Sequence, residues 1–237
     1  SIQRPSETPP YGEKFAIHPT DPDTVITDAF SNCYSRSDGA PCVSSSLIRS
    51  TDGGATWTNV PNPLFPDDFG MKQVWELLYD PADASIVYAI AVAEEPGVYK
   101  STDGGMTFAV AGGIGSPVWI NALVAAPTTP TTLYMGTGPT NGWLPGIWRS
   151  SDAAATWQQL TAGLPGDANV RTIAVHPTDA SRLFIGVQSA TDPGCYATTD
   201  SGDTWSHLAG AGLPANVGFL SLAIDPADPD VLYAGTG

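Results

Sequence analysis

Four carboxylates in this chain occupy places from which they could do acid–base chemistry: Asp28, Glu76, Glu94 and Glu95. Cleavage of a glycosidic bond needs two carboxyl groups on either side of that bond, about 5–10 Å apart. Asp28 is the best candidate because it ends an apolar run, and Glu76 is a second, weak one. Glu94 and Glu95 precede Pro96 in a short loop and are expected to be solvated. No partner for Asp28 stands out, so these residues favour a site without catalysis.

Aromatic and polar side chains form a second candidate site, one that could bind a sugar. Five residues stand six positions before a recurring proline, and we expect them to gather at one end of the fold: Glu13, Trp75, Asn121, Arg171 and Leu220. Tryptophan can stack on a sugar ring while polar groups bond its hydroxyls. The candidate ligand-binding residues are therefore Glu13, Trp75, Glu76, Trp119, Asn121, Trp143 and Arg171. The alternative is that the tryptophans fill loops and the charges are solvated.

The histidines do not indicate a metal site. His18 and His176 occupy the same repeat position, just before a proline, where Asp80 and Asp225 stand in other repeats. That alternation indicates turn chemistry, so no metal and no cofactor are predicted. The spacing of the residues also gives no serine or cysteine triad.

One motif that occurs four times sets the positions of these residues. It spans Ser50–Trp57, Ser101–Phe108, Ser150–Trp157 and Thr198–Trp205, and its aspartates are 51, 49 and 48 residues apart. A period of about fifty residues is typical of a repeat architecture. The aspartate can accept N–H groups of its turn, glycine allows positive φ, and the Trp or Phe can fill the space between repeats.

These motif residues are predicted to be structural. They are Asp52, Gly54, Trp57, Asp103, Gly105, Phe108, Asp152, Trp157, Asp200, Gly202 and Trp205. The third copy departs from the pattern, with Ala153 and Ala154 where glycine is usual. Calcium binding is the alternative interpretation, but the spacing lacks the several carboxylates and the distal glutamate of an EF-hand loop.

Short apolar runs, rich in β-branched and aromatic residues and bounded by Pro, Gly and Asp, surround each motif. Such runs predict strands, and no stretch shows a convincing helical period. Each repeat then holds four antiparallel strands, A to D, with the motif between C and D. The predicted fold class is all-β, a β-propeller with four full blades and one half blade.

The predicted domains are a Pro-rich tail over 1–12 and a single propeller over 13–237. Its blades cover about 13–62, 73–112, 119–162 and 170–210, with a partial blade over 218–237. The A–B and C–D turns share one side and are uniform, whereas the B–C and D–A loops on the other side vary, so a site is expected there. The last repeat lacks strands C and D, so strand B of that repeat would have an exposed edge, which tends to pair with other strands. It leaves three alternatives: a piece of a larger propeller, a small ring with a depleted blade, or association of copies.

The repeated motif resembles the Asp-box, or BNR repeat, over about residues 15–237. The resemblance implies a propeller and leaves the activity open, since it is shared by sialidases, xyloglucanase-like glycoside hydrolases, sortilin-type receptors and the Ycf48-type photosystem II assembly factors. The xyloglucanase-like family implies a catalytic aspartate near Asp28, but the match is displaced in register and lacks the surrounding glycines. Only Arg36 and Arg171 remain for the arginine triad of a sialidase, and the acidic chain lacks the arginine-rich patch of the assembly factors.

The composition of the chain indicates which partners and which cellular location to expect. The formal net charge is −15, with 9 Lys and Arg against 24 Asp and Glu, which disfavours nucleic acids and anionic membranes as partners. No apolar stretch is long enough to span a bilayer. A disulfide between Cys33 and Cys42 would staple a polar loop, with two free thiols as the alternative, and Cys195 is expected to be a buried thiol. These features favour an extracellular or periplasmic bacterial protein.

Together, these patterns predict a secreted, acidic propeller that acts as a non-catalytic binding or structural module, alone or within a larger extracellular assembly. The alternative is a carbohydrate-active propeller, either a glycoside hydrolase or a glycan-binding protein. The expected partner is a protein or a carbohydrate, with self-association or further blades at the open C-terminal edge.

Overall fold

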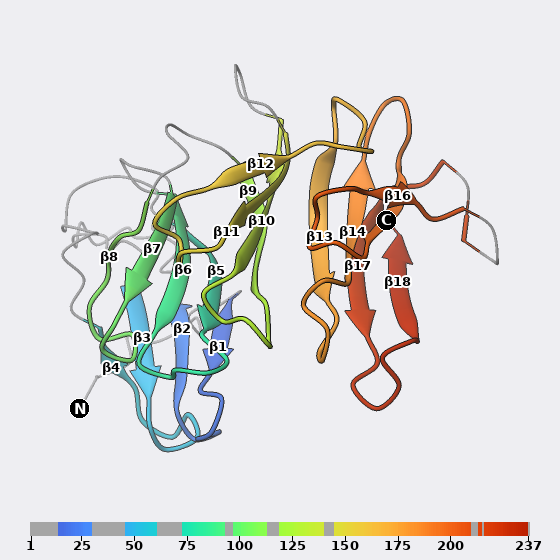
Figure 1. Cartoon of the computed structure of the whole chain (residues 1–237). Coiled ribbons are helices and arrows are strands. Elements are labelled where there is room, and N and C mark those ends of the chain that lie inside the picture. Colours follow the sequence, from blue (N-terminus) through green and yellow to red (C-terminus); the bar gives the residue numbers. More distant parts are fainter. Residues whose placement is uncertain are drawn as a thin grey trace, which may run out of the picture. The chain divides into compact units, whose positions relative to one another are not determined.

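The computed structural model describes residues 14–29, 46–60, 73–92, 97–112, 119–139, 145–209, 213–214 and 216–236. All regular structure in these ranges is β-strand (Figure 1). The chain divides into two compact units, Ser1–Ala111 and Gly112–Gly237, each with its own apolar core. Within the described ranges, the structure has no helix with the length and apolar character needed to cross a membrane.

The first unit holds two four-stranded antiparallel sheets, each ordered as in the chain. The first blade comprises β1 (Phe15–Ile17), β2 (Val25–Ala29), β3 (Ser46–Ser50) and β4 (Thr58–Asn59). The second comprises β5 (Gln73–Tyr79), β6 (Val87–Val92), β7 (Gly97–Ser101) and β8 (Ala109–Val110). Residues of both blades share one buried cluster, which includes Ile26, Leu47, Leu77, Val87 and Phe108.

The second unit repeats this plan and adds a pair of strands. The third blade comprises β9 (Trp119–Ala125), β10 (Leu133–Gly138), β11 (Gly146–Ser150) and β12 (Gln158–Leu160). The fourth comprises β13 (Asn169–Val175), β14 (Leu183–Gln188), β15 (Gly194–Thr198) and β16 (Ser206–His207), and the partial blade comprises β17 (Phe219–Ile224) and β18 (Leu232–Thr236). The predicted all-β propeller architecture of four full blades and one half blade is confirmed.

The four repeated motifs fold into the same hydrogen-bonded turn. In the third copy the Ser150 hydroxyl donates to Asp152 at 2.8 Å, and the N–H and hydroxyl of Thr156 donate to the two Asp152 oxygens at 2.8 and 2.6 Å. The other copies repeat these contacts around Asp52, Asp103 and Asp200. The Thr156 hydroxyl, with its N–H and the Ser150 hydroxyl, lowers the pKa of Asp152 to about 2. The stability from these contacts is therefore present above the unfolded pKa of 3.8 and lost as the pH falls through about 2.

The aromatic residue that ends each motif packs to different depths. Phe108 and Trp205 are buried, whereas Trp57 and Trp157 are half-buried. The indole N–H of Trp157 donates to the Gly112 carbonyl at 3.2 Å, which ties the third motif to the first residue of its own unit.

The histidine or aspartate before four of the five strand-A prolines caps its own turn, as the sequence indicated, whereas Ala126 has no side-chain acceptor. The Nδ1 atom of His18 accepts the N–H of Asp21 at 3.1 Å. Oδ1 of Asp80 does the same for Ala82 at 2.9 Å. Histidine and aspartate alternate here because either can present an acceptor to the turn.

The third motif reaches the left-handed turn without glycine. Ala153 and Ala154 have φ of 58° and 72°, close to the 67° and 88° of Gly53 and Gly54 in the first copy. A non-glycine residue in this region is strained, because its Cβ approaches the following carbonyl oxygen. The hydrogen bonds around Asp152 therefore hold two alanines in a backbone conformation that they disfavour.

Replacing Ala153 with glycine should stabilise the protein, because glycine adopts φ of 58° without strain. We expect the free energy of unfolding to rise by about 0.5–1 kcal/mol, measured by urea unfolding. Ala155→Gly is the control, since Ala155 lies in the same turn without a positive φ and should lose stability instead. Equal losses in both variants would show that Ala153 is not strained.

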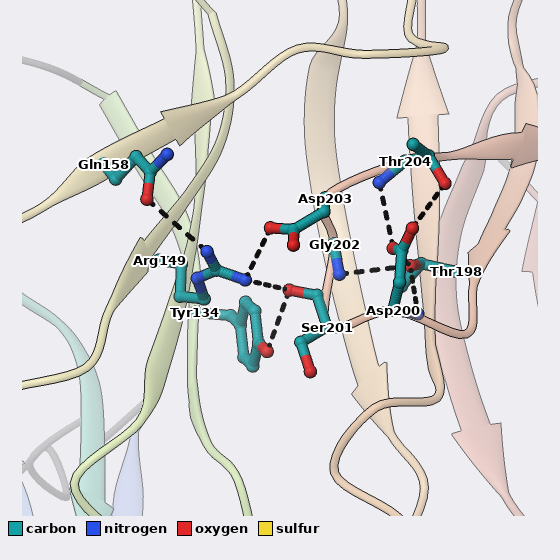
Figure 2. A network of polar contacts seen from close by, with 9 residues as sticks. All are labelled: Tyr134, Arg149, Gln158, Thr198, Asp200, Ser201, Gly202, Asp203 and Thr204. Atoms are coloured by element: carbon teal, nitrogen blue, oxygen red, sulfur yellow. Dashed lines mark hydrogen bonds and ion pairs between the residues drawn. The ribbon is translucent and has the colours of Figure 1, made fainter.

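A polar network joins the third and fourth blades. Ser201, in the fourth motif, has φ of 62°, and its carbonyl accepts the Tyr134 hydroxyl at 3.1 Å and Nη1 of Arg149 at 2.9 Å. Arg149 also pairs with Asp203 at 2.9 Å (Figure 2). The left-handed residue thus turns its carbonyl toward the neighbouring sheet, so the motif fixes one blade to the next as well as closing its own hairpin.

The structure tests only one of the two predictions about the cysteines. Cys33 and Cys42 lie outside the described residues, so their disulfide stays a prediction. Cys195 is a buried free thiol, as expected, and burial raises its pKa to about 11.

Candidate functional site

One extra residue interrupts the pairing of the innermost strand in each blade from the second onward. The register of β5, β9, β13 and β17 with the next strand shifts at a single position. The residues skipped by the pairing are Trp75, Asn121, Arg171 and Leu220. These are the described members of the set that stands six positions before a proline. β-Bulges re-aim side chains and are common next to active sites, so this repeated bulge marks a candidate site on each blade.

In the first unit, Lys14 contacts both of the carboxylates that the sequence singled out. Its backbone N–H donates to Oδ1 of Asp28 at 3.1 Å, and its Nζ lies 3.9 Å from Oε2 of Glu76. Asp28 lies on β2 and is 2% exposed, while Glu76 follows the bulge in β5 and its side chain is 28% exposed. Lys14 is therefore a common neighbour of the two carboxyl groups, through its backbone for one and its side chain for the other.

The two carboxyl groups sit in different environments. Burial raises the pKa of Glu76 above 4.5, and the Lys14 ammonium partly offsets this effect. Two carboxyl groups whose environments differ in this way are the kind of pair that acid–base catalysis can use.

Removing the Lys14 charge should raise the pKa of Glu76 further. The folded protein then binds the Glu76 proton more tightly than the unfolded chain, so stability falls as the pH rises between the two pKa values. We expect Lys14→Met to move the Glu76 titration to higher pH, followed by carbon NMR of its carboxyl group. Lys100→Met is the control, because Lys100 lies over the Tyr88 ring. An unchanged Glu76 titration in Lys14→Met would contradict the assigned ion pair.

In the second unit, bulged residues of neighbouring blades meet. Nη1 of Arg171 donates to Oδ1 of Asn121 at 3.1 Å, although the residues are 50 positions apart. The Asn121 amide donates to Oδ1 of Asn169 and to the Val170 carbonyl, both at 2.9 Å. The Asn169 amide in turn donates to Oε1 of Gln188 at 3.3 Å. The result is a connected polar cluster on β9, β13 and β14.

The remaining predicted site residues divide into two groups. Trp75 is half-buried at its bulge, and Trp119 begins β9, where only its backbone is described. Glu13, Trp143, Glu94 and Glu95 lie outside the described residues.

Sequence reasoning missed Lys14, Asn169 and Gln188. Lys14 stands at the repeat position of Glu76, which was a usable signal. Asn169 and Gln188 gave no such signal. Side chains normally alternate between the two faces of a strand, but the bulge between Val170 and Thr172 breaks this alternation, so the residues on the same face as Arg171 could not be selected from the sequence.

A cavity of about 450 Å³ lies on the turn-bearing side of the third and fourth blades. Its lining includes Tyr134, Arg149 and Ser201, which belong to the network in Figure 2. Because those polar groups already bond one another, this cavity is a weaker candidate than the bulged positions.

Comparison with known proteins places this chain beside xyloglucanases. No family model matches it. It is 28% identical over 201 residues to a xyloglucanase of Hypocrea jecorina, covering 82% of this chain and 20% of that protein. It is 25% identical over 260 residues to the xyloglucanase Xgh74A of Acetivibrio thermocellus, covering 94% of this chain and 29% of that protein. The chain thus spans less than a third of these relatives.

A solved structure gives the same fold. The GH74 xyloglucanase from Xanthomonas campestris superposes with a TM-score of 0.69 at 19% identity, covering 95% of this chain and 35% of that one. At this identity the likeness supports the fold alone.

These relatives correct one prediction. The sequence favoured a non-catalytic binding or structural module, and that prediction is wrong, because the related proteins are named as enzymes that act on xyloglucan. That prediction rested on the lack of a partner for Asp28, whereas the structure places Lys14 against both Asp28 and Glu76. The carbohydrate-active alternative is the better one.

Proposed function

We propose that the protein to which this chain belongs is a glycoside hydrolase that acts on a xyloglucan-type glycan. The observation that carries the proposal is Lys14, which contacts both Asp28 and Glu76. The relatives supply the class of substrate, because they are named xyloglucanases.

In the proposed reaction the two carboxyl groups have different roles. Glu76, whose pKa is raised by burial, donates a proton to the leaving glycosidic oxygen. Asp28 accepts a proton from the attacking water, and the half-buried Trp75 beside Glu76 offers a face on which a sugar ring can stack. Lys14 holds Asp28 through its backbone N–H and limits the rise of the Glu76 pKa.

The setting follows from the same proposal. The four hydrogen-bonded turns support a place among Asp-box propellers, and residues 13–237 would form one run of blades in a larger propeller protein. A polysaccharide substrate cannot enter a cell intact, which supports an extracellular location.

The test is hydrolysis by the full natural protein. Xyloglucan is incubated with it, and new reducing ends are measured beside starch and an unbranched β-glucan. We expect release from xyloglucan. If no reducing ends appear but the protein is retarded in a xyloglucan-containing gel, the site binds without cleaving. If the protein neither cleaves xyloglucan nor is retarded in the gel, the proposal is overturned.

A further inference from the structure

Arg171 lacks the carboxylate partner that two other described arginines have. Arg149 pairs with Asp203 and Arg182 with Asp230. Arg171 is exposed, and across the described ranges no carboxylate lies within ion-pair distance of it. Its one described hydrogen bond runs from Nη1 to the Asn121 amide oxygen. A cation in a chain of net charge −15 is thus held in place by a neutral group.

The support for Arg171 is a chain of side-chain amides. Gln188 accepts from Asn169, Asn169 accepts from Asn121, and Asn121 accepts from Arg171. The chain passes close to Gly138, where an added Cβ would lie 3.0 Å from Oδ1 of Asn169 and 3.2 Å from Nδ2 of Asn121. Because Gly138 has no side chain, the amides of Asn121 and Asn169 can meet in this space.

The direction of these hydrogen bonds determines what the cluster offers to a ligand. Each amide oxygen in the chain already accepts a bond from its neighbour, and both amide protons of Asn121 are used. The charged groups left over are the remaining N–H donors of the Arg171 guanidinium. A planar fork of N–H donors on a cation matches the two oxygens of a carboxylate.

We infer that Arg171 and its amide support bind the carboxylate of an acidic sugar, such as a glucuronate unit of a glycan. The preference for a carboxylate rests on Arg171 and the Asn121 contact, and it is independent of the proposed xyloglucan substrate, which is a neutral glycan. Because the acidic chain repels anions elsewhere, the bulge at Arg171 would place an acidic unit at one defined position.

The test compares sodium D-glucuronate with D-glucose by proton–nitrogen NMR of the full protein. We expect glucuronate to shift the Arg171 Nε–H signal and the Asn121 amide signals, with binding that weakens as salt is added. Glucose should not shift them. Arg171→Gln should weaken glucuronate binding by at least about tenfold. Arg171→Lys should retain part of it, since the charge remains without the fork.

Two variants separate a positioned site from a mere surface charge. Arg182→Gln removes the same charge from the same unit and should leave glucuronate binding unchanged. Asn121→Leu keeps the charge of Arg171 but removes its support, and should weaken binding with the fold intact. The inference is overturned if glucose binds as well as glucuronate, or if Arg171→Gln binds glucuronate like the wild type. Xyloglucan hydrolysis is measured in parallel, so failure of the proposed function shows separately.

Discussion

Replacing Asp28 with asparagine is expected to reduce glycan hydrolysis by about 10²–10⁴-fold. Asparagine has the shape of aspartate, and its amide oxygen can still accept the Lys14 N–H that bonds Asp28 at 3.1 Å. It cannot accept a proton from water. We therefore expect kcat to fall while KM for a xyloglucan oligosaccharide changes little, because the lost interaction belongs to the transition state.

The matched control for this variant is Asp23→Asn. Asp23 is an exposed aspartate in the first blade, in the uniform turn between β1 and β2. Its replacement should leave kcat unchanged. Glu76→Gln should lower kcat and remove the high-pH fall of activity, since a neutral amide has no proton to lose. A wild-type kcat in Asp28→Asn, or a loss explained by a lower unfolding temperature, would contradict the assigned role.

Replacing Gly163 with alanine is expected to cost about 2–5 kcal/mol of unfolding free energy. Gly163 has φ of +86°, and a Cβ there would overlap the Trp205 carbonyl oxygen and lie 2.9 Å from its carbonyl carbon. The obstacle is backbone and cannot rotate away. It is also held in place, because the Trp205 N–H donates to the Ala162 carbonyl at 2.9 Å. Urea unfolding followed by tryptophan fluorescence measures the loss.

Gly166 provides a control in the same loop. It has no positive φ, and a Cβ there would meet nothing within 4 Å. We expect Gly166→Ala to remain within about 0.5 kcal/mol of the wild type or to be slightly more stable. If both alanine variants unfold alike, the close approach of Gly163 to the fourth motif does not contribute to stability.

The sequence was a good guide to the blades because their determinants are local. Each repeated turn is closed by hydrogen bonds over two to four residues, such as those from Ser150 and Thr156 to Asp152. Apolar runs on either side supply strands that pair with their chain neighbours. Even the two alanines of the third motif did not mislead, since the surrounding contacts impose the left-handed turn on them.

The candidate site was predicted less completely, because its contacts are not local. The spacing before each proline selected Trp75, Asn121 and Arg171, and each proved to be the extra residue of a bulge. It did not show that Asp28 and Glu76 share Lys14 as a neighbour, and this led to the wrong prediction of a non-catalytic module.

The sequence by itself determined the blades of this chain and their turns, because each blade carries its own copy of the motif and hydrogen bonds within one hairpin close each turn. Only the tertiary structure decided which side chains of different blades meet. Lys14 reaches Glu76, and Arg171 reaches Asn121 50 residues away, because the innermost strands of neighbouring sheets pack against each other and bring residues of different repeats into contact.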